Sequence, residues 1–422
     1  MRRSFWILGS VVSLAATTLA ACSSTSGGGS NLGLTGGTTG TGATSGSGAT
    51  SGGGGSSASG GTGGGIIIDG GGNSGGGGTG GGVQCSSGAN DDKDKDGFTV
   101  AQGDCNDCDV NVNPGAIDVL HTEDGGTNWG DEDCDGKPGS SAELCDDTIA
   151  LEDVDPLNAA KTIELCRKTS ASEKTWGVIE AQWVRADGSA FGSPGEQVGI
   201  QPDFGPNVHP QGGKRMLAIS SGNSRTPSQA GACGSNSCDH NTGVTPPAGF
   251  PQDTAGCLGA ADINDDVALQ VKLRAPTNAT GYSFSFRFYS FEYPEWVCTS
   301  FNDQFITLVD PAPAGSIMGN ICFDSKSNPV TVNVGFFDVC SGCPAGTNDL
   351  VGNGFDTWDD AGATVWLVTQ APVTGGQEVT LRFTIWDTGD QAWDSTALID
   401  NFQWIANGGT VTVGTTPIPT PK

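Results

Sequence analysis

The sequence has few basic residues, few histidines and few tyrosines. Nineteen Lys and Arg stand against 47 Asp and Glu, so the 422 residues have a formal net charge of −28. So acidic a surface repels phosphate backbones and anionic lipid headgroups, which excludes nucleic acid as a partner. Three His and three Tyr leave few groups for acid–base catalysis near neutral pH, and neither an H-E-x-x-H nor a P-loop motif occurs. We therefore expect a protein that is not an enzyme.

Residues 1–21 have the three parts of a secretory signal peptide. Arg2 and Arg3 supply positive charge, Phe5–Ala16 is apolar, and Leu19-Ala20-Ala21-Cys22 is a small-residue cleavage site. This last segment resembles the lipobox of bacterial lipoproteins, which implies that Cys22 is lipidated and anchors the chain in the cell envelope. An ordinary secretory signal that contains a cysteine is the alternative. No second apolar segment in the sequence is long enough to span a membrane.

Residues 22–84 form a linker after the signal peptide. They are almost entirely Gly, Ser, Thr and Ala, and they cannot bury enough apolar surface to offset the loss of chain entropy. We expect a disordered tether here. By the same lipoprotein resemblance, Ser23 directly after Cys22 implies the outer membrane and exposure at the cell surface, with the acyl chains as the membrane anchor.

Residues 85–139, called the acidic module below, contain 14 Asp and Glu against three Lys, a net charge of −11, and few large apolar side chains. Such a segment cannot fold around an apolar core, so we expect cations and disulfides to hold it together. The sequence Asp92-Lys93-Asp94-Lys95-Asp96-Gly97 matches the first half of a calcium loop, in which alternate carboxylates converge and Gly makes the turn. Gly103 stands where an EF-hand has its last Glu, so this is not an EF-hand.

Three segments of the acidic module, residues 92–98, 104–116 and 131–136, resemble the short metal-binding repeats of the MopE type. That family's label implies copper, which prefers imidazole or sulfur ligands, yet only His121 lies in the module. Carboxylate and carbonyl oxygens favour calcium, while copper, zinc and a solvated segment without a metal are the alternatives. The expected ligands are Asp92, Asp94, Asp96, Phe98 through its carbonyl, Asp104, Asp107, Asp109, Asp131, Asp133 and Asp135.

Residues 140–409 are predicted to form one domain, mainly β with a minor helix. Asp155 can cap a helix that begins at Pro156, and apolar residues alternate with period two in residues 282–288 and 379–385. An antiparallel β-sandwich of the jelly-roll kind is therefore the expected fold, with residues 410–422 as a C-terminal tail. Further strands are expected at residues 268–275, 305–309, 330–337, 364–369 and 397–405.

Two motifs in this domain combine acidic and aromatic residues. The first is Phe291-Glu292-Tyr293-Pro294-Glu295-Trp296 followed by Phe301-Asn302-Asp303-Gln304-Phe305, and the second is Trp386-Asp387-Thr388-Gly389-Asp390 followed by Trp393-Asp394-Ser395. Together they resemble the choice-of-anchor L family of bacterial surface domains. That family is defined by its position beside varied anchoring devices, and the resemblance implies a surface role without an assigned activity.

The side chains of these motifs are candidate binding residues. Carboxylates from neighbouring loops can form a second calcium site, although Asp also satisfies the backbone of turns. Trp296 and Trp393 are candidates for stacking on sugar rings, as are Trp358, Trp366 and Trp386, with burial in the core as the alternative. The candidates for the second metal site are Glu292, Glu295, Asp303, Asp387, Asp390 and Asp394.

Thirteen cysteines remain besides Cys22, an odd number that leaves one thiol free or paired between chains. Cys340 and Cys343 form either a local bridge or two separate pairs. The sequence as a whole predicts a lipid-anchored, calcium-binding surface protein that acts in adhesion or in binding an extracellular ligand, either a glycan or a surface protein. A purely structural envelope protein and a glycan-cleaving enzyme that uses carboxylates are the alternatives. The local disulfides expected are Cys145–Cys166, Cys233–Cys238 and Cys298–Cys322.

Overall fold

The computed structural model describes residues 86–123, 126–139, 144–333, 335–357, 360–406 and 409–418. The chain divides into two compact units, Met1–Asp69 and Gly70–Lys422, and the first unit lies wholly outside the described residues. The predicted signal peptide, lipidated Cys22 and linker therefore also lie outside them. Within the described ranges no helix is both long and apolar enough to cross a membrane.

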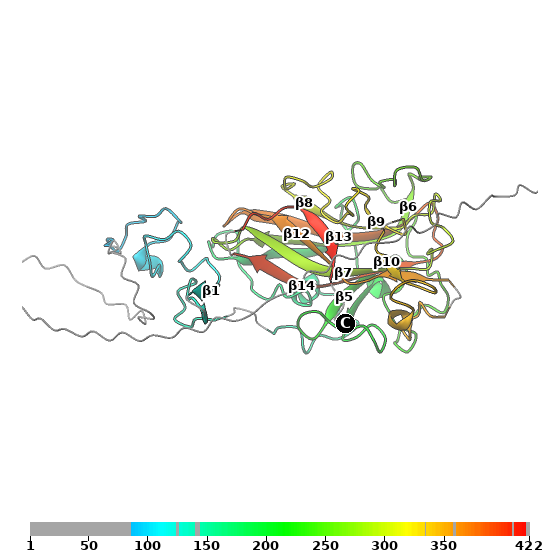
Figure 1. The fold of residues 1–422 in the computed structure, drawn as a ribbon, viewed down its shortest axis with the longest axis horizontal. Helices are drawn as coiled ribbons and strands as arrows, with labels where there is room; N and C mark the ends of the chain where they lie inside the picture. The colour runs from blue at the N-terminus through cyan, green and yellow to red at the C-terminus, as the bar shows by residue number, and fades with distance from the viewer. Residues whose placement is uncertain are drawn as a thin grey trace, which may run out of the picture. The chain divides into compact units, whose positions relative to one another are not determined.

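Residues 144–418, called the head below, are built from two antiparallel β-sheets packed face to face (Figure 1). The eight-stranded sheet has the order β10-β11-β7-β14-β5-β4, with β12 pairing both β7 and β15, and the five-stranded sheet has the order β3-β6-β13-β8-β9. A separate two-stranded ribbon of β1 and β2 lies in the acidic module. The strands are β1 Leu120–Glu123, β2 Gly126–Trp129, β3 Gly177–Val184, β4 Val198–Gln201, β5 Met216–Ser220, β6 Ile263–Arg274, β7 Gly281–Ser290, β8 Gln304–Asp310, β9 Val330–Thr331, β10 Phe337–Val339, β11 Gly362–Thr364, β12 Leu367–Pro372, β13 Glu378–Thr388, β14 Ser395–Ile405 and β15 Gly414–Pro417. The helices are α1 Pro156–Lys161 and the 3-10 turns η1 Val100–Gln102, η2 Gly195–Gln197 and η3 Asn348–Leu350.

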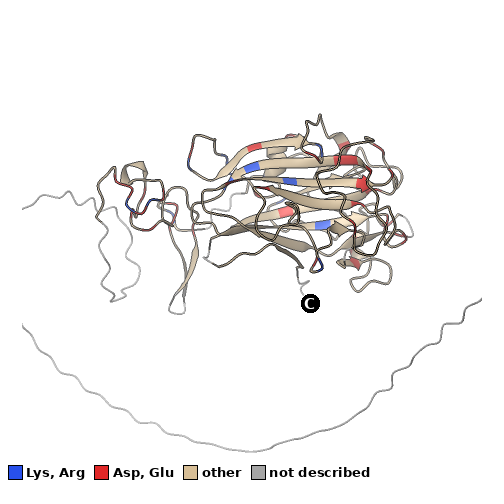
Figure 2. Ribbon diagram, turned by 90° about the horizontal axis from the view of Figure 1, so that it is seen from above, with Lys and Arg blue, Asp and Glu red and all other residues tan. Residues whose placement is uncertain are grey.

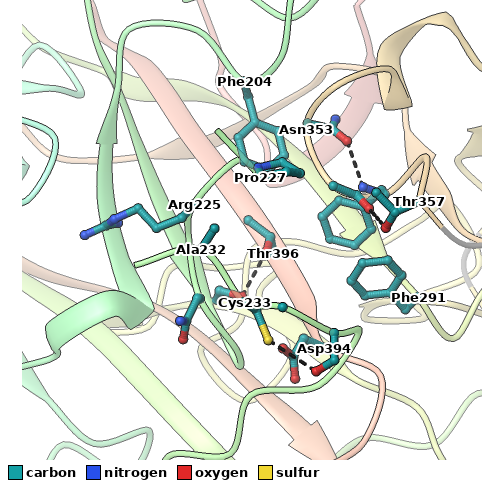
Figure 3. Close-up of a pocket in the computed structure, with 16 residues that line it drawn as sticks. Phe204, Arg225, Pro227, Ala232, Cys233, Phe291, Asn353, Thr357, Asp394 and Thr396 are labelled. Carbon is teal, nitrogen blue, oxygen red and sulfur yellow. Dashed lines mark hydrogen bonds between the residues drawn. The ribbon is translucent and has the colours of Figure 1, made fainter. Parts of the chain in front are cut away.

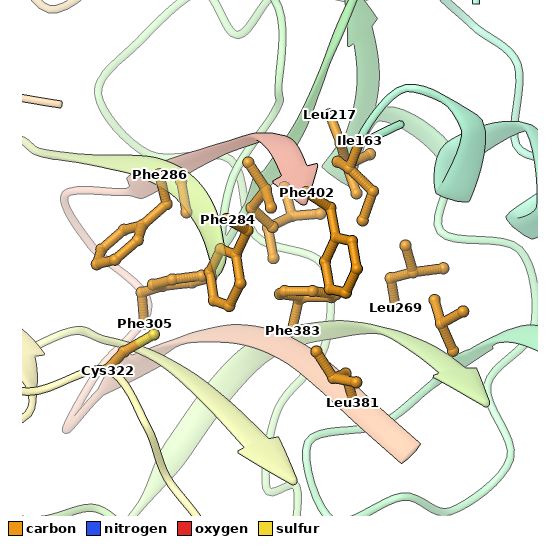
Figure 4. Close-up of a cluster of buried hydrophobic side chains, with 14 of the residues drawn as sticks. Ile163, Leu217, Leu269, Phe284, Phe286, Phe305, Cys322, Leu381, Phe383 and Phe402 are labelled. Atoms are coloured by element: carbon orange, nitrogen blue, oxygen red, sulfur yellow. The ribbon is translucent and has the colours of Figure 1, made fainter. Parts of the chain in front are cut away.

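The core lies between the two sheets and is rich in phenylalanine (Figure 4). Phe284 of β7 and Phe383 of β13 meet edge to face with ring centroids 5.1 Å apart, and both side chains are fully buried. Successive residues of a strand point to opposite faces, so the period-two pattern of these two strands places one face of each against the other sheet. The sandwich predicted from that alternation is confirmed.

The single α-helix begins where the sequence predicts it. The Asp155 carboxylate accepts the Leu157 amide at 2.8 Å, and Pro156 occupies the first helical position, where its missing N–H costs nothing. Ala159 and Ala160 of the helix are buried against the core. The Cys145–Cys166 disulfide closes the loop that carries this helix, as expected.

Several strands differ from the sequence prediction. The expected strand 364–369 is two strands, β11 and β12, which both pair with β7, and the expected strand 330–337 is interrupted between β9 and β10. The strands β3, β4 and β5 are not among those that the sequence predicts. Residues 414–417, expected to belong to a tail, form β15 and pair with β12 at the edge of the sheet.

The disulfides confirm two of the three predicted local pairs, Cys145–Cys166 and Cys233–Cys238. Of the two alternatives for Cys340 and Cys343, the structure shows the local bridge. The predicted Cys298–Cys322 pair is wrong, because Cys298 lies in an exposed loop and bonds Cys257. Cys322 is fully buried in the core between the sheets and is the free cysteine among the described residues. Cys105–Cys134 bridges the acidic module.

Candidate metal centre

The D-x-D-x-D-G segment of the acidic module folds into a tight loop closed by its own carboxylates. Asp92 accepts the Gly97 amide at 3.2 Å, Asp94 accepts the Asp96 amide at 3.2 Å, and Asp96 accepts the Phe98 amide at 2.7 Å. Gly97 has a φ of 98°, a left-handed conformation that a side chain would strain. The local sequence therefore makes the turn, and the turn aligns the carboxylates.

Three groups of aspartates in the acidic module bring carboxylate oxygens within 4.8 Å of one another. They are Asp92, Asp94 and Asp96; Asp94, Asp104 and Asp107; and Asp118, Asp131 and Asp133. Every member is an aspartate, the oxygen donor that hard cations such as calcium prefer. Asp94 belongs to two of the groups, so the carboxylates of the first two repeats lie next to each other.

Asp104 and Asp107 are the most deeply buried aspartates of these groups, at 4% and 2% exposure. Burial, together with the nearby Asp96 and Asp94 carboxylates, raises the pKa of Asp104 to about 6, although its hydrogen bond with the Asn106 amide opposes the rise. One oxygen each of Asp94, Asp96 and Asp104 is buried without any hydrogen-bond partner. Buried anionic oxygens without partners are costly, and a bound cation would satisfy them.

The structure places the remaining predicted ligands of the module differently. Asp109 and Asp135 lie outside the three groups, and Asp135 instead contacts Lys137 at 3.6 Å. Phe98 has a buried side chain beneath the Lys174 ammonium, 5.5 Å from the ring centroid. Asp118 joins a group that the sequence did not assign it to, because it follows Pro114-Gly115-Ala116-Ile117 outside any alternating acidic pattern.

The segment around Ala116 connects the module to the head through its backbone. The Asn278 side chain accepts the Ile117 amide at 3.1 Å and donates to the Ile117 carbonyl at 2.8 Å. The Trp176 indole donates to the Ala116 carbonyl at 3.0 Å, and the Thr277 amide donates to the Gly115 carbonyl at 2.9 Å. A side chain at Gly115 would meet the Thr277 methyl group at 2.9 Å, so Gly permits this close approach.

A second set of carboxylates lies inside the head, where strands of both sheets end. Ser290 of β7 lies opposite Ser395 of β14 in one sheet, and Gln304 of β8 lies opposite Trp386 of β13 in the other. Acidic residues stand at or beside these ends, and Figure 2 shows Asp and Glu at strand ends of the head. They are Glu292, Asp303, Asp387 and Asp394, which we call the carboxylate cage; their exposed fractions are 1%, 0%, 0% and 4%.

Part of the cage is held by hydrogen bonds. Asp303 accepts the Thr388 amide at 3.0 Å and the Ser395 hydroxyl at 2.7 Å, and its own amide donates to Glu292 at 3.2 Å. One oxygen of Asp394 accepts the Cys238 amide at 3.0 Å. Both oxygens of Asp387 and the other oxygen of Asp394 have no well-aligned donor, although the Asp303 carboxyl and the Ser221 hydroxyl lie beside Asp387.

The cage has no basic partner among the described residues, because none of their ion pairs includes one of its four carboxylates. Burial raises the pKa of all four groups, and repulsion from another member of the cage adds to the effect at each of them. The pKa of Asp394 rises to about 9. At neutral pH such a cluster must keep protons or take up a cation.

Two predicted members of this site are not in the cage. Glu295 and Asp390 are exposed, and the groups that face Glu295 include Asp360. Asp265, which the sequence did not predict, is fully buried beside the cage and accepts the His240 and Asn241 amides. Its charge contributes to the raised pKa of Asp387 and of Asp394.

The tryptophans divide between core and surface. Trp386 is fully buried beside Phe250, so it cannot stack on a sugar ring at the surface. Trp296 and Trp393 are partly exposed, and their rings meet edge to face with centroids 5.4 Å apart. Trp393 directly precedes cage residue Asp394. Its amide donates to the Ser237 hydroxyl at 2.8 Å, and Ser237 lies in the loop closed by the Cys233–Cys238 disulfide. Trp366 is partly buried, and Trp358 lies outside the described residues.

A pocket of about 400 Å³ opens beside the cage. Its wall includes Asp394 together with Phe291 and Phe204, as Figure 3 shows. The loop that carries the Cys233–Cys238 disulfide contributes Cys233 and Ser235. Asp394 thus belongs both to the cage and to a pocket with mixed aromatic and polar walls.

Comparison with known proteins identifies the part of the head that holds the cage. No curated protein matches this chain. One family model matches residues 219–402, from within β5 to within β14, and this range includes all four cage carboxylates and the pair Trp296 and Trp393. Residues 219–402 of the chain are therefore a choice-of-anchor L domain.

Proposed function

We propose that this protein is a calcium-binding, lipid-anchored surface protein of the cell envelope whose head binds an extracellular ligand. The observation that carries the calcium assignment is Asp387, which is fully buried with no well-aligned donor to either carboxylate oxygen. Three further buried carboxylates lie close enough for the charges of the four to act on one another, and no basic side chain pairs with any of them among the described residues. A divalent cation would offset this charge and use the free oxygens.

Calcium fits these donors better than copper or zinc does. The groups in the acidic module consist of aspartates alone, and the cage consists of aspartate and glutamate. Copper and zinc favour imidazole and thiolate ligands. His121, the histidine of the module, instead contacts Glu132 at 2.6 Å, and the described cysteines of the module are disulfide-bonded.

Placement outside the cytoplasm is supported by the cysteines. Five disulfides join described residues, and such bonds form and persist in oxidising compartments. Lipidation of Cys22 and placement in the outer membrane are proposed from the lipobox resemblance. Incorporation of labelled palmitate into the chain tests the anchor: we expect it to be lost in Cys22→Ser, and equal labelling of this variant would contradict it.

A ligand-binding role for the head is supported by the exposed side chains near the cage. Trp296 and Trp393 present partly exposed rings, and the disulfide Cys257–Cys298 lies between exposed Leu258, at 67% exposure, and exposed Val297, at 41%. Exposed aromatic and apolar side chains grouped beside polar ones are typical of binding surfaces, and indole rings stack on sugars. We propose a glycan as the ligand class.

Calorimetric titration of the purified full-length chain with calcium tests the metal assignment. We expect Asp94→Asn, which changes a residue shared by two aspartate groups, to weaken calcium binding about tenfold. Asp91→Asn is the matched control, because Asp91 is exposed and lies outside these groups. An absence of heat at millimolar calcium would refute the assignment, since even weak extracellular sites bind at ~10⁻⁴–10⁻³ M.

Glycan-array binding in calcium tests the ligand class. We expect binding that is lost in Trp393→Ala and retained in Trp129→Ala, a control that removes an indole 43% exposed in the acidic module. An array without any bound glycan would favour the purely structural alternative. Polysaccharide cleavage that disappears in Glu295→Gln would favour the enzyme instead.

A further inference from the structure

The acidic module meets the head along a buried seam. The module side of the seam is residues 113–117, called the seam segment below, which are buried apart from one partly exposed proline. The head side consists of Trp176, Thr277 and Asn278. Besides the hydrogen bonds to the backbone of the seam segment described above, the Thr277 hydroxyl donates to the Asn113 side chain at 2.9 Å. The seam is therefore closed by hydrogen bonds between segments that are far apart in the sequence.

The aspartate loop of residues 92–97 reaches the seam directly. Phe98 follows this loop, and its side chain is buried. A side-chain carbon at Gly115 would lie 3.0 Å from a Phe98 ring carbon, so the ring lies against the seam segment. Lys174 of the head lies over the same ring, and its ammonium group donates to the Gly97 carbonyl. The turn that aligns the loop carboxylates is therefore also a contact with the head.

The seam segment also contacts the other acidic repeats. The Asn113 amide donates to the Glu132 carbonyl at 2.8 Å, within the third repeat. Burial raises the pKa of Asp96, and the hydrogen bonds that oppose the rise include one from the Asn113 side chain. Asp118, directly after the seam segment, belongs to the third aspartate group. The seam segment therefore lies between aspartate groups and contacts residues of the first and third repeats.

Charge repulsion within these groups acts against the seam when no cation is bound. Their carboxylate oxygens lie within 4.8 Å of one another, and none of the ion pairs among the described residues includes a member of the groups. One buried oxygen each of Asp94, Asp96 and Asp104 has no hydrogen-bond donor. Like charges at this range favour more open loops. Opening would draw Phe98 and Asp118 away from the positions that support the seam segment.

We propose that calcium bound in the acidic module holds the module against the head, and that loss of the ion releases the seam segment from Trp176, Thr277 and Asn278. This inference rests on the calcium sites proposed for the module and adds an effect of the ion outside the module. The core between the two sheets includes no residue of the seam, so the head stays folded after release. Calcium would thus decide whether module and head move as one unit or as two.

Hydrogen exchange on the unaltered full-length chain tests this coupling without any variant. The Ile117 and Thr277 amides donate across the seam. We expect peptides that contain them to exchange about tenfold or more slowly in calcium than in EGTA, because bound calcium suppresses the local opening. Equal exchange in a chain that binds calcium by calorimetry would overturn this inference alone. A chain that binds no calcium would refute the proposed function as well.

Exchange followed across a calcium titration connects the seam to the aspartates of the module. We expect Asp94→Asn to raise the calcium concentration that protects the Ile117 amide by about tenfold, in line with its weaker calcium binding. Asp91→Asn is the matched control, because Asp91 is exposed and lies outside the aspartate groups, and it should leave this concentration unchanged. Protection of Ile117 at the same calcium concentration in both variants would overturn the proposal.

The coupling is reciprocal, so loosening the seam should weaken calcium binding. Asn278 bonds the Ile117 backbone and belongs to none of the aspartate groups. We expect Asn278→Ala to weaken, by about fivefold or more in calorimetry, the same calcium binding that Asp94→Asn weakens. Asn207→Ala is the control, since the exposed Asn207 amide also bonds a backbone carbonyl, at 2.7 Å, but within the head. Equal calcium affinity in Asn278→Ala and Asn207→Ala would overturn the proposal.

Discussion

Replacing Asp387 by Asn separates a metal-binding role of the cage from a purely structural one. Asp387 is fully buried, and neither of its oxygens has a well-aligned hydrogen-bond donor. The Asn amide has nearly the same shape as the Asp carboxylate, but it carries no negative charge and has two N–H donors. These donors would lie beside Asp303, whose charge raises the pKa of Asp387. Without calcium the substitution should therefore relieve the repulsion by Asp303, while the amide can keep the contacts that Asp387 makes with Asp303 and Ser221.

The size of the effect follows from the burial of the group. Leaving one buried polar group unsatisfied costs about 1–3 kcal/mol, and more for a charged one. A domain of this size gains about 2–4 °C in melting temperature per kcal/mol. In EGTA, Asp387→Asn should therefore melt no lower than the unaltered chain, and up to roughly 10 °C higher. A ligand at 100 times its dissociation constant stabilises by about 2.7 kcal/mol. The calcium-induced rise in melting temperature should therefore be about 5–10 °C smaller in the variant.

The assay is thermal unfolding of the full-length chain at pH 7.5, in EGTA and in excess calcium, followed by circular dichroism. Asp390→Asn is the control, since Asp390 follows closely in the same motif but is exposed. Its calcium-induced rise should equal that of the unaltered chain. An equal rise in Asp387→Asn, or a large loss of stability in EGTA, would refute the reasoning that Asp387 is a ligand.

Three further predictions concern pH, the free thiol and the core. In EGTA the free energy of unfolding should fall as pH rises from about 4 to 9. The reason is that the cage carboxyls, with the pKa of Asp394 raised to about 9, hold more protons in the folded chain than in the unfolded chain. Urea titrations at several pH values check this, and a flat profile would contradict it. Calcium should reduce this fall, because it binds the ionised carboxylates. Burial raises the pKa of Cys322 to about 12, so a thiol reagent should label this residue only after the chain unfolds. Peptide mapping locates the label, and fast labelling of the native chain would disprove the burial of Cys322. Phe383→Ala should lower the free energy of unfolding by about 3–5 kcal/mol, measured in urea, and a loss below about 1 kcal/mol would show that the inter-sheet core is not packed as described.

Features that depend on neighbouring residues were predictable from the sequence. The α1 helix needed only Asp155 to accept an amide two residues on and Pro156 to occupy the first turn. The 92–97 loop needed alternating Asp and a turn with positive φ at Lys95 and Gly97. Cys233 and Cys238 are separated by five positions in the sequence, so little chain had to be placed correctly. In each case the interaction is local and its energy is nearly independent of the rest of the fold.

Features that depend on strand register were not predictable in the same way. Short strands such as β4 and β5 have four or five residues, too few to establish a period, and their burial on both faces removes the alternation. Cys322 was assigned a partner by spacing, yet the fold buries it between the sheets and brings Cys257 to Cys298. Long-range packing decides such pairings.

The sequence alone determined that this chain is rich in carboxylates, poor in cations to pair with them, and built to fold as a β-sandwich with disulfides. Tertiary structure decided which carboxylates share a dry interior. Glu292 enters the cage while Glu295, three residues on, faces solvent, and Asp400 meets Glu164 although β14 and the segment before β3 are far apart in sequence. The physical reason is that burial raises the cost of a charge, and burial is set by how two sheets align rather than by any one segment.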